Sequence, residues 1–193
     1  SAVRAGKHVW YDKPAGDDWQ GWQEAVAEAR ERKLLIQMGY MFRFNPAFQI
    51  TVDAAKRGWL GRVFSVHAEM SKTLSPGERA KLLAYKGGSM FELGCHLIDA
   101  IVWMLGKPDR VTPFPRSFPG DGFNDNMVAV LEYPDAHVTV RSSLMEPDGG
   151  ARRQFVVCGD HGSAEIRPLE PPVLKLMFDQ GRGKYRKGVQ EVS

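Results

Sequence analysis

The sequence predicts an α/β protein in which a short parallel βαβ unit is followed by a mainly antiparallel sheet. Residues 34–38 (LLIQM) have strand length and are apolar except for Gln37, which is typical of a strand covered on both faces in a parallel sheet. Later segments alternate apolar and polar side chains, which is typical of an antiparallel sheet with one covered face. Apolar residues make up 43% of the 193 residues, enough to form a core, so a disordered chain is excluded.

The parallel unit is expected within residues 1–39. A strand is predicted at Val9–Tyr11, and Pro14 ends it because proline has no backbone N–H. Asp17 is the expected helix N-cap, with a glutamine three residues later completing a capping box, and apolar residues follow at helical spacing. With the strand at residues 34–38, the order strand, helix, strand forms one βαβ unit.

A second helix and an alternating strand follow. Asn45 is the expected cap and Pro46 the first helical residue, and apolar side chains recur on one face over residues 48–59. Glycines near the end of that segment stop the helix. Apolar and polar side chains alternate over residues 64–70, so we expect a strand with one covered face.

The rest of the chain predicts one buried helix and several paired strands. The helix spans Ser89–Leu105, is apolar around most of its circumference, and ends at Gly106. A proline- and glycine-rich loop is expected at residues 107–124, and the basic segment 181–188 is expected to be a solvated tail. Strands are expected at residues 127–133, 137–144, 155–158, 163–166 and 173–178.

Three ionisable residues share one stripe of the buried helix. Glu92, His96 and Asp99 are spaced i, i+4 and i+7, so their side chains lie on the same face. Charged groups on a buried helix need partners, a cleft or a metal to offset the loss of hydration. A general base, with a carboxylate to orient it, fits this arrangement.

Simpler interpretations of the stripe stay open. Ser89 and Glu92 form a capping-box pattern, so Glu92 could bond only the backbone at the helix start. His96 could be a structural histidine, and Cys95 is expected to be a small core residue rather than a nucleophile. Carboxylate and imidazole groups also suit divalent metals, so a metal site of an isomerase or hydrolase is another alternative, although our preferred interpretation includes no metal.

Two cations are expected at the carboxyl edge of the parallel strands, where open α/β sheets bind ligands. Lys13 follows the first strand, between Asp12 and Pro14, and Arg43 follows the second. Both are candidates to contact a ligand. The alternatives are a plain surface lysine and, for Arg43, a salt bridge that holds the loop.

Three segments resemble motifs of the Gfo/Idh/MocA oxidoreductases, in the family's order and approximate spacing. Residues 5–9 (AGKHV), continuing to residues 12–14 (DKP), are similar to A-G-K-H-V…E-K-P. Residues 39–46 (GYMFRFNP) are similar to G-x-x-x-R-F-x-P, and residues 87–99 (GGSMFELGCHLID) to G-G-G…D-x-G-x-H-x-x-D. The resemblance covers nearly the whole chain.

This resemblance implies an enzyme that uses NAD or NADP to oxidise a hydroxyl, or reduce a carbonyl, on a sugar, cyclitol or related small molecule. It implies that residues 1–43 are the C-terminal remnant of a dinucleotide-binding Rossmann domain. Residues 44–193 would form a substrate-binding and oligomerisation domain with a large open sheet, through which we expect a homo-oligomer. A non-catalytic member of the fold that binds a ligand or a partner is the alternative.

The resemblance also implies roles for individual residues. His96 is expected to transfer the hydroxyl proton, Lys13 to stabilise the oxyanion, and Glu92 to support the histidine. The residues expected to contact the cofactor are Asp12, Lys13 and Pro14. Substrate contacts are expected from Arg43, Tyr85 and Asp99, and the loops at residues 70–87 and 107–124 are expected to shape the pocket.

The chain departs from the family's pattern at several points. Asp12 replaces a glutamate, Glu92 replaces an aspartate, and Ser89 replaces a third glycine. No G-x-G-x-x-G phosphate-binding motif occurs in the sequence. We therefore expect the chain to be a piece of a longer enzyme.

Charge and hydropathy exclude other classes of partner. The net charge of +3 gives no indication of nucleic acid or of an anionic membrane surface. The longest fully apolar run, Ala100–Leu105, is far shorter than the roughly 20 residues that span a bilayer. Two cysteines without a C-x-x-C pair predict neither a disulfide framework nor a zinc knuckle, and we expect a cytoplasmic protein.

Overall fold

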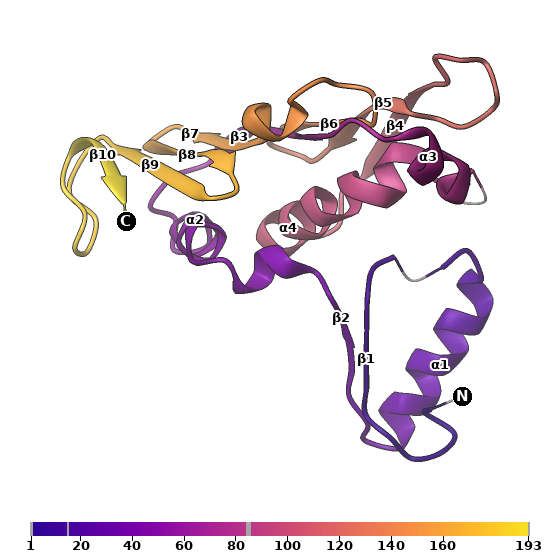
Figure 1. Ribbon diagram of the computed structural model, residues 1–193. Helices are drawn as coiled ribbons and strands as arrows, with labels where there is room; N and C mark the ends of the chain where they lie inside the picture. Colours follow the sequence, from indigo (N-terminus) through magenta and orange to yellow (C-terminus); the bar gives the residue numbers. More distant parts are fainter. Residues whose placement is uncertain (1, 15, 84–85, 193) are drawn as a thin grey trace. The chain divides into compact units, whose positions relative to one another are not determined.

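The computed structural model describes residues 2–14, 16–83 and 86–192, and it divides into two compact units, residues 1–41 and 42–193. The first unit contains β1 (Val9–Tyr11), α1 (Trp19–Glu31) and β2 (Ile36–Met38) (Figure 1). β1 and β2 pair in parallel, with Val9 opposite Ile36. The predicted βαβ unit is therefore confirmed.

One helix cap in this unit differs from the prediction. α1 begins after Asp18, whose carboxylate accepts the backbone N–H of Gly21, so the cap lies one residue later than Asp17. Two consecutive aspartates offer the same chemistry, and the backbone geometry decides which carboxylate reaches the third N–H of the helix. α1 packs on β1 through an edge-on contact of Trp22 with Tyr11, whose ring centroids lie 5.3 Å apart.

The second unit is built on one eight-stranded sheet. Its strands lie in the order β10-β9-β8-β7-β3-β6-β5-β4, and among these described strands every neighbouring pair except β3–β6 is antiparallel. The large, mainly antiparallel sheet is therefore confirmed. The strands are β3 (Val63–Ser71), β4 (Arg110–Arg116), β5 (Asn126–Glu132), β6 (His137–Ser143), β7 (Gln154–Gly159), β8 (Gly162–Leu169), β9 (Pro172–Phe178) and β10 (Gly188–Val192).

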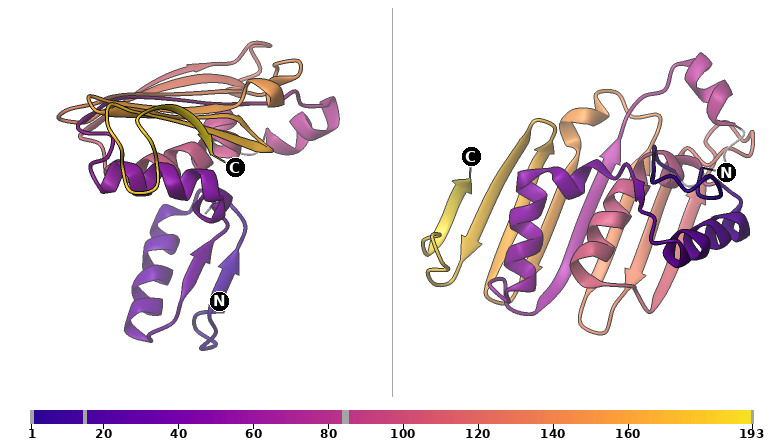
Figure 2. Two further views of the ribbon diagram at one scale, coloured as in Figure 1. Left: turned by 90° about the vertical axis from the view of Figure 1, so that its left-hand side faces the viewer. Right: turned by 90° about the horizontal axis from the view of Figure 1, so that it is seen from below.

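Two helices, α2 (Pro46–Lys56) and α4 (Cys95–Leu105), cover one face of this sheet (Figures 1 and 2). Asn45 caps α2 by accepting the N–H of Ala47, as predicted. Gly106 ends α4 with a φ of 83°, a left-handed conformation that favours glycine. The core lies between these helices and the sheet, and its fully buried members include Phe48, Leu97, Ile101, Val138, Phe155 and Leu176.

The alternation in β3 corresponds to the two faces of the sheet. Val66, Ala68 and Met70 are buried in the core under the helices. His67 lies on the opposite face and is exposed, but Glu69 on that same face is buried because it pairs with Arg141 of β6. A buried carboxylate is tolerated there because a cation meets it.

Two proline-containing segments expected to be loops hold regular structure. β4 lies inside the expected loop 107–124, and its Pro113 and Pro115 cannot donate to a ladder. β4 is an edge strand, where missing N–H groups are tolerated, so the prolines do not prevent pairing. α3 (Pro76–Leu82) lies inside the expected loop 70–87 and begins at a capping box in which Ser75 and Glu78 bond each other's backbone.

The expected tail at residues 181–188 is instead the turn between β9 and β10. Its Tyr185 packs against Trp59 and Phe178, with ring centroids 6.0 and 6.1 Å away. β10 then pairs with β9. The basic side chains made this segment resemble a tail, but one aromatic side chain anchors it to the core.

Candidate active site

His96 is the second residue of α4 and is 5% exposed. The ring of Phe42 meets its imidazole edge-on, with centroids 5.7 Å apart. Phe42 is itself stacked on Phe48, with centroids 4.1 Å apart and nearly parallel planes. The imidazole therefore packs against a rigid aromatic pair, which restricts its orientation.

The helix that carries His96 does not start as predicted. Residues 90–94 form a π-helical turn, and Ser89 does not cap it. The Ser89 hydroxyl instead donates to the carbonyl of Ser142, whose hydroxyl donates to the carbonyl of Ser89, at 2.9 and 3.0 Å. The capping-box interpretation is therefore wrong, because two fully buried serines satisfy one another's backbone. Such π turns within helices are frequent at functional sites.

Gly88 explains how the chain enters this turn. Its φ is +54°, and a Cβ at this position would lie 2.2 Å from the carbonyl oxygen of Asn124. That same oxygen accepts the N–H of Ser89 at 2.8 Å. Only glycine allows this close approach, which holds the start of the helix against the segment before β5.

Glu92 lies in the π turn, four residues before His96, and accepts a hydrogen bond from Lys72. The distance from Lys72 Nζ to Glu92 Oε1 is 2.9 Å, and both side chains are partly exposed. The sequence reasoning missed Lys72. It directly follows β3, which the alternating pattern predicted as an antiparallel strand, so the rule applied to Lys13, which concerns the carboxyl ends of parallel strands, did not extend to it.

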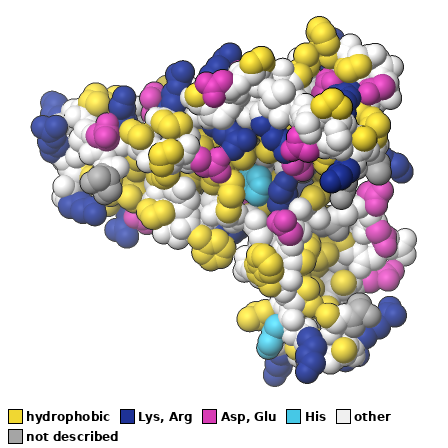
Figure 3. All heavy atoms as spheres, viewed as in Figure 1, with side chains coloured by type: hydrophobic (Ala, Val, Ile, Leu, Met, Phe, Trp, Pro, Cys, Tyr) yellow, Lys and Arg dark blue, Asp and Glu magenta, His cyan; other side chains and the backbone are white. Residues whose placement is uncertain are grey.

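Arg43 and Asp99 form a bidentate ion pair. Arg43 Nε and Nη2 donate to the two carboxylate oxygens of Asp99, each at 2.8 Å. The guanidinium also lies 5.7 Å from the centroid of the Trp103 ring. This is the salt bridge named as the alternative for Arg43, and it joins the segment before α2 to α4. More generally, Figure 3 shows acidic side chains next to basic ones on the surface, and the sequence contains nearly equal numbers of the two.

A family model for the GFO/IDH/MocA C-terminal domain matches residues 48–165, more than half of the chain. The chain belongs to the Gfo/Idh/MocA family. It is 33% identical to the trans-1,2-dihydrobenzene-1,2-diol dehydrogenase of Bos taurus over 202 residues, an alignment that covers 94% of this chain and 59% of the bovine enzyme. The chain thus spans about three fifths of the length of that relative.

Solved structures of other proteins share this fold. An NAD binding oxidoreductase from Klebsiella pneumoniae superposes with a TM-score of 0.85 at 18% identity, covering 99% of this chain and 55% of that one. An inositol dehydrogenase homolog from Azotobacter vinelandii, complexed with NADH and myo-inositol, gives a TM-score of 0.82 at 21% identity, covering 99% and 51%. At these identities the likeness shows the fold.

The residues expected to contact the cofactor lie in the first unit. Asp12, Lys13 and Pro14 follow β1, and the Asp12 carboxylate accepts the backbone N–H of Lys13 at 2.8 Å. Beside them, the N–H of Gly39 donates to the carbonyl of Tyr11, so the carboxyl ends of β1 and β2 meet. Tyr85, expected to contact substrate, lies outside the described residues.

Two of the side chains named for the metal alternative bind cationic side chains of this chain. Within residues 2–14, 16–83 and 86–192, no three His, Cys, Asp or Glu side chains are placed to hold a metal ion. Glu92 and Asp99 are instead engaged by Lys72 and Arg43. Among the described helices, none is long and apolar enough to cross a membrane.

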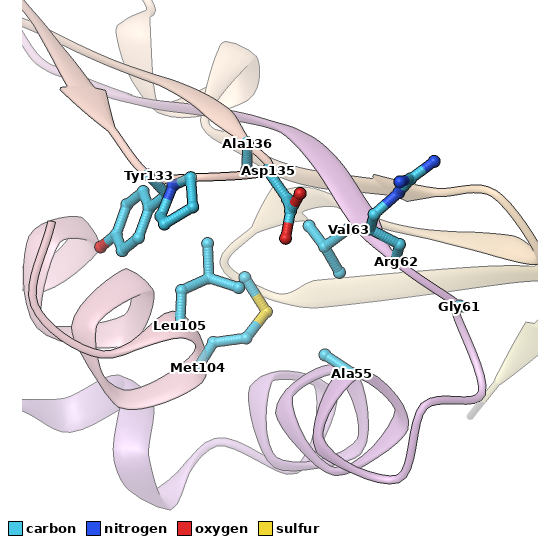
Figure 4. Close-up of a pocket in the computed structure, with 10 residues that line it drawn as sticks. Ala55, Gly61, Arg62, Val63, Met104, Leu105, Tyr133, Asp135 and Ala136 are labelled. Carbon is cyan, nitrogen blue, oxygen red and sulfur yellow. The ribbon is translucent and has the colours of Figure 1, made fainter. Parts of the chain in front are cut away.

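A surface pocket of about 320 Å³ lies at the other end of α4 (Figure 4). Met104 and Asp135 point into it, and none of the residues predicted for the active site lines it. The pocket therefore belongs to a different part of the second unit from His96. It is lined by Ala55, Gly61, Arg62, Val63, Met104, Leu105, Tyr133, Pro134, Asp135 and Ala136.

Proposed function

We propose that this chain is part of an oxidoreductase that moves a hydride between NAD or NADP and a hydroxyl or carbonyl group of a sugar, cyclitol, dihydrodiol or related small molecule. The family membership supports the reaction class. The bovine relative is named as a dihydrodiol dehydrogenase, and the Azotobacter homolog is complexed with NADH and myo-inositol. In this proposal residues 1–43 are the end of the dinucleotide-binding domain, and residues 44–193 bind the substrate.

The observation that carries the proposal is the environment of His96. The imidazole is buried and packed against Phe42, and carboxylates from the same helical segment are held by Lys72 and Arg43. A buried histidine can act as the base for a hydroxyl proton when a carboxylate of the same helical segment stabilises the imidazolium that forms. His96 therefore removes the proton from the substrate hydroxyl.

The residues after β1 suit the nicotinamide end of a dinucleotide. Asp12 orients the backbone of Lys13 at the meeting point of two parallel strands, which is where open α/β sheets bind ligands. When bound, the cofactor supplies the hydride acceptor. Lys13 contributes a positive charge that stabilises the developing oxyanion, and Asp12 and Pro14 shape the contact with the cofactor.

Arg43 and Asp99 are proposed to bind the substrate as a pair, together with Tyr85. The ion pair fixes both side chains in one geometry, so a polyol meets a preorganised donor and acceptor rather than two mobile chains. Two paired opposite charges also leave this part of the site suited to an uncharged ligand.

A histidine comparison in the complete enzyme tests the proposed function. With NAD⁺ or NADP⁺, formation of reduced nicotinamide is measured on myo-inositol and on trans-1,2-dihydrobenzene-1,2-diol. His96→Ala is expected to lower kcat by about 100- to 10,000-fold, the usual contribution of a general base. His67→Ala, which removes an exposed histidine of β3, serves as the matched control and is expected to retain activity. Equal activity of the two variants would show that His96 is not the base.

A binding measurement separates this enzyme from a non-catalytic member of the fold. Quenching of tryptophan fluorescence by NAD(H) and NADP(H) reports cofactor binding, because the chain has five tryptophans. Binding accompanied by turnover supports the dehydrogenase and identifies the preferred cofactor. Tight binding without turnover of any polyol or dihydrodiol would favour the ligand-binding alternative.

The bare face of the sheet is the proposed surface for a homo-oligomer. α2 and α4 cover the other face, and Phe114, Met177 and Val189 are exposed large apolar side chains of strands β4, β9 and β10. Burying such side chains between two copies removes apolar surface from water. Light scattering coupled to size exclusion measures the assembly, and a monomer at all concentrations would contradict it.

A further inference from the structure

The backbone of Lys72 is fixed by its neighbours on three sides. Its N–H donates to the carbonyl of Ser143 at 2.9 Å, and its carbonyl accepts the N–H of Glu146 at 3.3 Å. Gly149 lies against the same peptide, since a Cβ at that position would be 3.0 Å from the Lys72 nitrogen. The side chain of Lys72 therefore extends from a rigid point beside the end of β3.

From that point Lys72 reaches Glu92 in the turn that precedes His96. The Nζ to Oε1 distance is 2.9 Å, and the two side chains are 29% and 22% exposed. A glutamate has one more rotatable bond than the aspartate that the family's motif carries, so its carboxylate needs an external partner to keep one orientation. Lys72 supplies that partner with a charge-assisted hydrogen bond.

The fold does not depend on this ion pair. The start of the helix is already tied to β6 by the two hydrogen bonds between Ser89 and Ser142, both fully buried. An ion pair whose two side chains are both partly exposed to water contributes little to stability. The main consequence of losing Lys72 should therefore fall on the orientation of Glu92.

We propose that Lys72 is a positioning residue, which holds the Glu92 carboxylate in the orientation that supports His96 during proton transfer. This inference rests on the function proposed above. Glu92 stabilises the imidazolium only while its carboxylate stays in place, and Lys72 binds that carboxylate from the end of β3. The pair acts as a unit, so removing either member should disable the other's contribution.

Three variants of the complete enzyme test this assignment with steady-state kinetics. Lys72→Met is expected to lower kcat roughly 10- to 100-fold, the scale of a misplaced catalytic group, with little change in KM. Lys72→Arg keeps the charge and the donor and is expected to recover most of the loss. Lys187→Met is the matched control, because Lys187 is an exposed lysine of the turn between β9 and β10 and belongs to none of the segments expected to shape the pocket, and it should behave as wild type.

A kinetic double-mutant cycle separates positioning from a general structural role. Glu92→Gln alone should lower kcat, and adding Lys72→Met to it should lower kcat no further, with melting temperatures close to wild type throughout. Additive losses in the double variant, or a Lys72→Met enzyme as active as Lys187→Met, would overturn this inference while leaving the proposed function intact. A wild-type enzyme that oxidises no polyol or dihydrodiol would overturn the proposed function and this inference together.

Discussion

Arg79 of α3 joins two segments that the sequence predicted as loops. Removing Arg79 should lower the free energy of unfolding, mainly through the loss of one of its two ion pairs. Its Nη1 donates to Asp125 at 2.7 Å, while Nε and Nη2 donate to Asp121. The Asp125 side chain is 2% exposed, whereas that of Asp121 is 35% exposed. Asp125 also accepts the backbone N–H of Phe118, so it organises the segment between β4 and β5.

The size of the expected loss of stability depends on whether the charge that loses its partner is buried. Removing one member of a buried ion pair costs about 3–5 kcal/mol, because the other charge stays buried. Arg79 is 22% exposed, so water can partly enter the space that Arg79→Met leaves, and we expect a loss near the lower limit, about 3 kcal/mol. Asp121→Asn removes only the exposed contact and should cost much less than Arg79→Met.

Urea unfolding measures both losses. With a slope of about 2 kcal/mol per molar, Arg79→Met should lower the midpoint by about 1.5 M, and Asp121→Asn by much less. Asp125→Asn removes the buried charge, so the Arg79→Met/Asp125→Asn double variant should lose less than the sum of its two single variants. Strictly additive losses, or equal losses for Arg79→Met and Asp121→Asn, would refute this reasoning.

Two further predictions concern the supports of the site. Gly88→Ala should destabilise the protein by about 2 kcal/mol or more, because a Cβ would clash with the Asn124 carbonyl at a positive φ. Glu146 provides a prediction for pH. Burial alone would raise its pKa, but the hydrogen bond and charge of Arg141, with the nearby Arg152, outweigh burial and hold the pKa below its usual range. A lowered pKa in the folded state stabilises the protein above the unfolded value of about 4.3, and that stabilisation is lost as pH falls through the folded pKa. Glu146→Gln should therefore be less stable at neutral pH and lose less stability than wild type on acidification.

Each of these two predictions has its own control. Gly120→Ala introduces the same side chain at a positive φ with no atom within 4 Å, so its melting temperature reports backbone strain without the clash. Equal melting temperatures for the two alanine variants would show that the clash with the Asn124 carbonyl does not cause the loss of stability. For Glu146, unfolding free energies are compared from pH 7 to about pH 3, and parallel curves for wild type and Glu146→Gln would contradict the sign of the pKa shift.

Periodicity and cap chemistry predicted most of the second unit's elements. Asn45 followed by Pro46 located the start of α2, and the alternation over residues 64–70 located β3. β4 was missed because Pro113 and Pro115 normally argue against a strand, and only the position at the sheet edge makes them harmless. α3 carried a readable signal, since Ser75 and Glu78 are spaced as a capping box.

The candidate site was predicted in part. The spacing of Glu92, His96 and Asp99 placed them on one helical segment, and the structure confirms that placement together with the Arg43 salt bridge. Lys72 could not be paired with Glu92 from spacing, because the two residues come from a strand end and a helix that meet only in the folded unit. Their role in catalysis stays a prediction until the variants are measured.

The sequence by itself determined most of the helices and strands and which ionisable side chains share a helix, because these depend on neighbours within a few residues. It did not indicate β4, α3 and β10 clearly enough to be recognised. Tertiary structure decided the pairing of distant segments: β3 parallel to β6, Ser89 bonded to Ser142, and Lys72 bonded to Glu92. Such pairs depend on burial and hydrogen bonding throughout the whole unit, so local sequence patterns do not predict them.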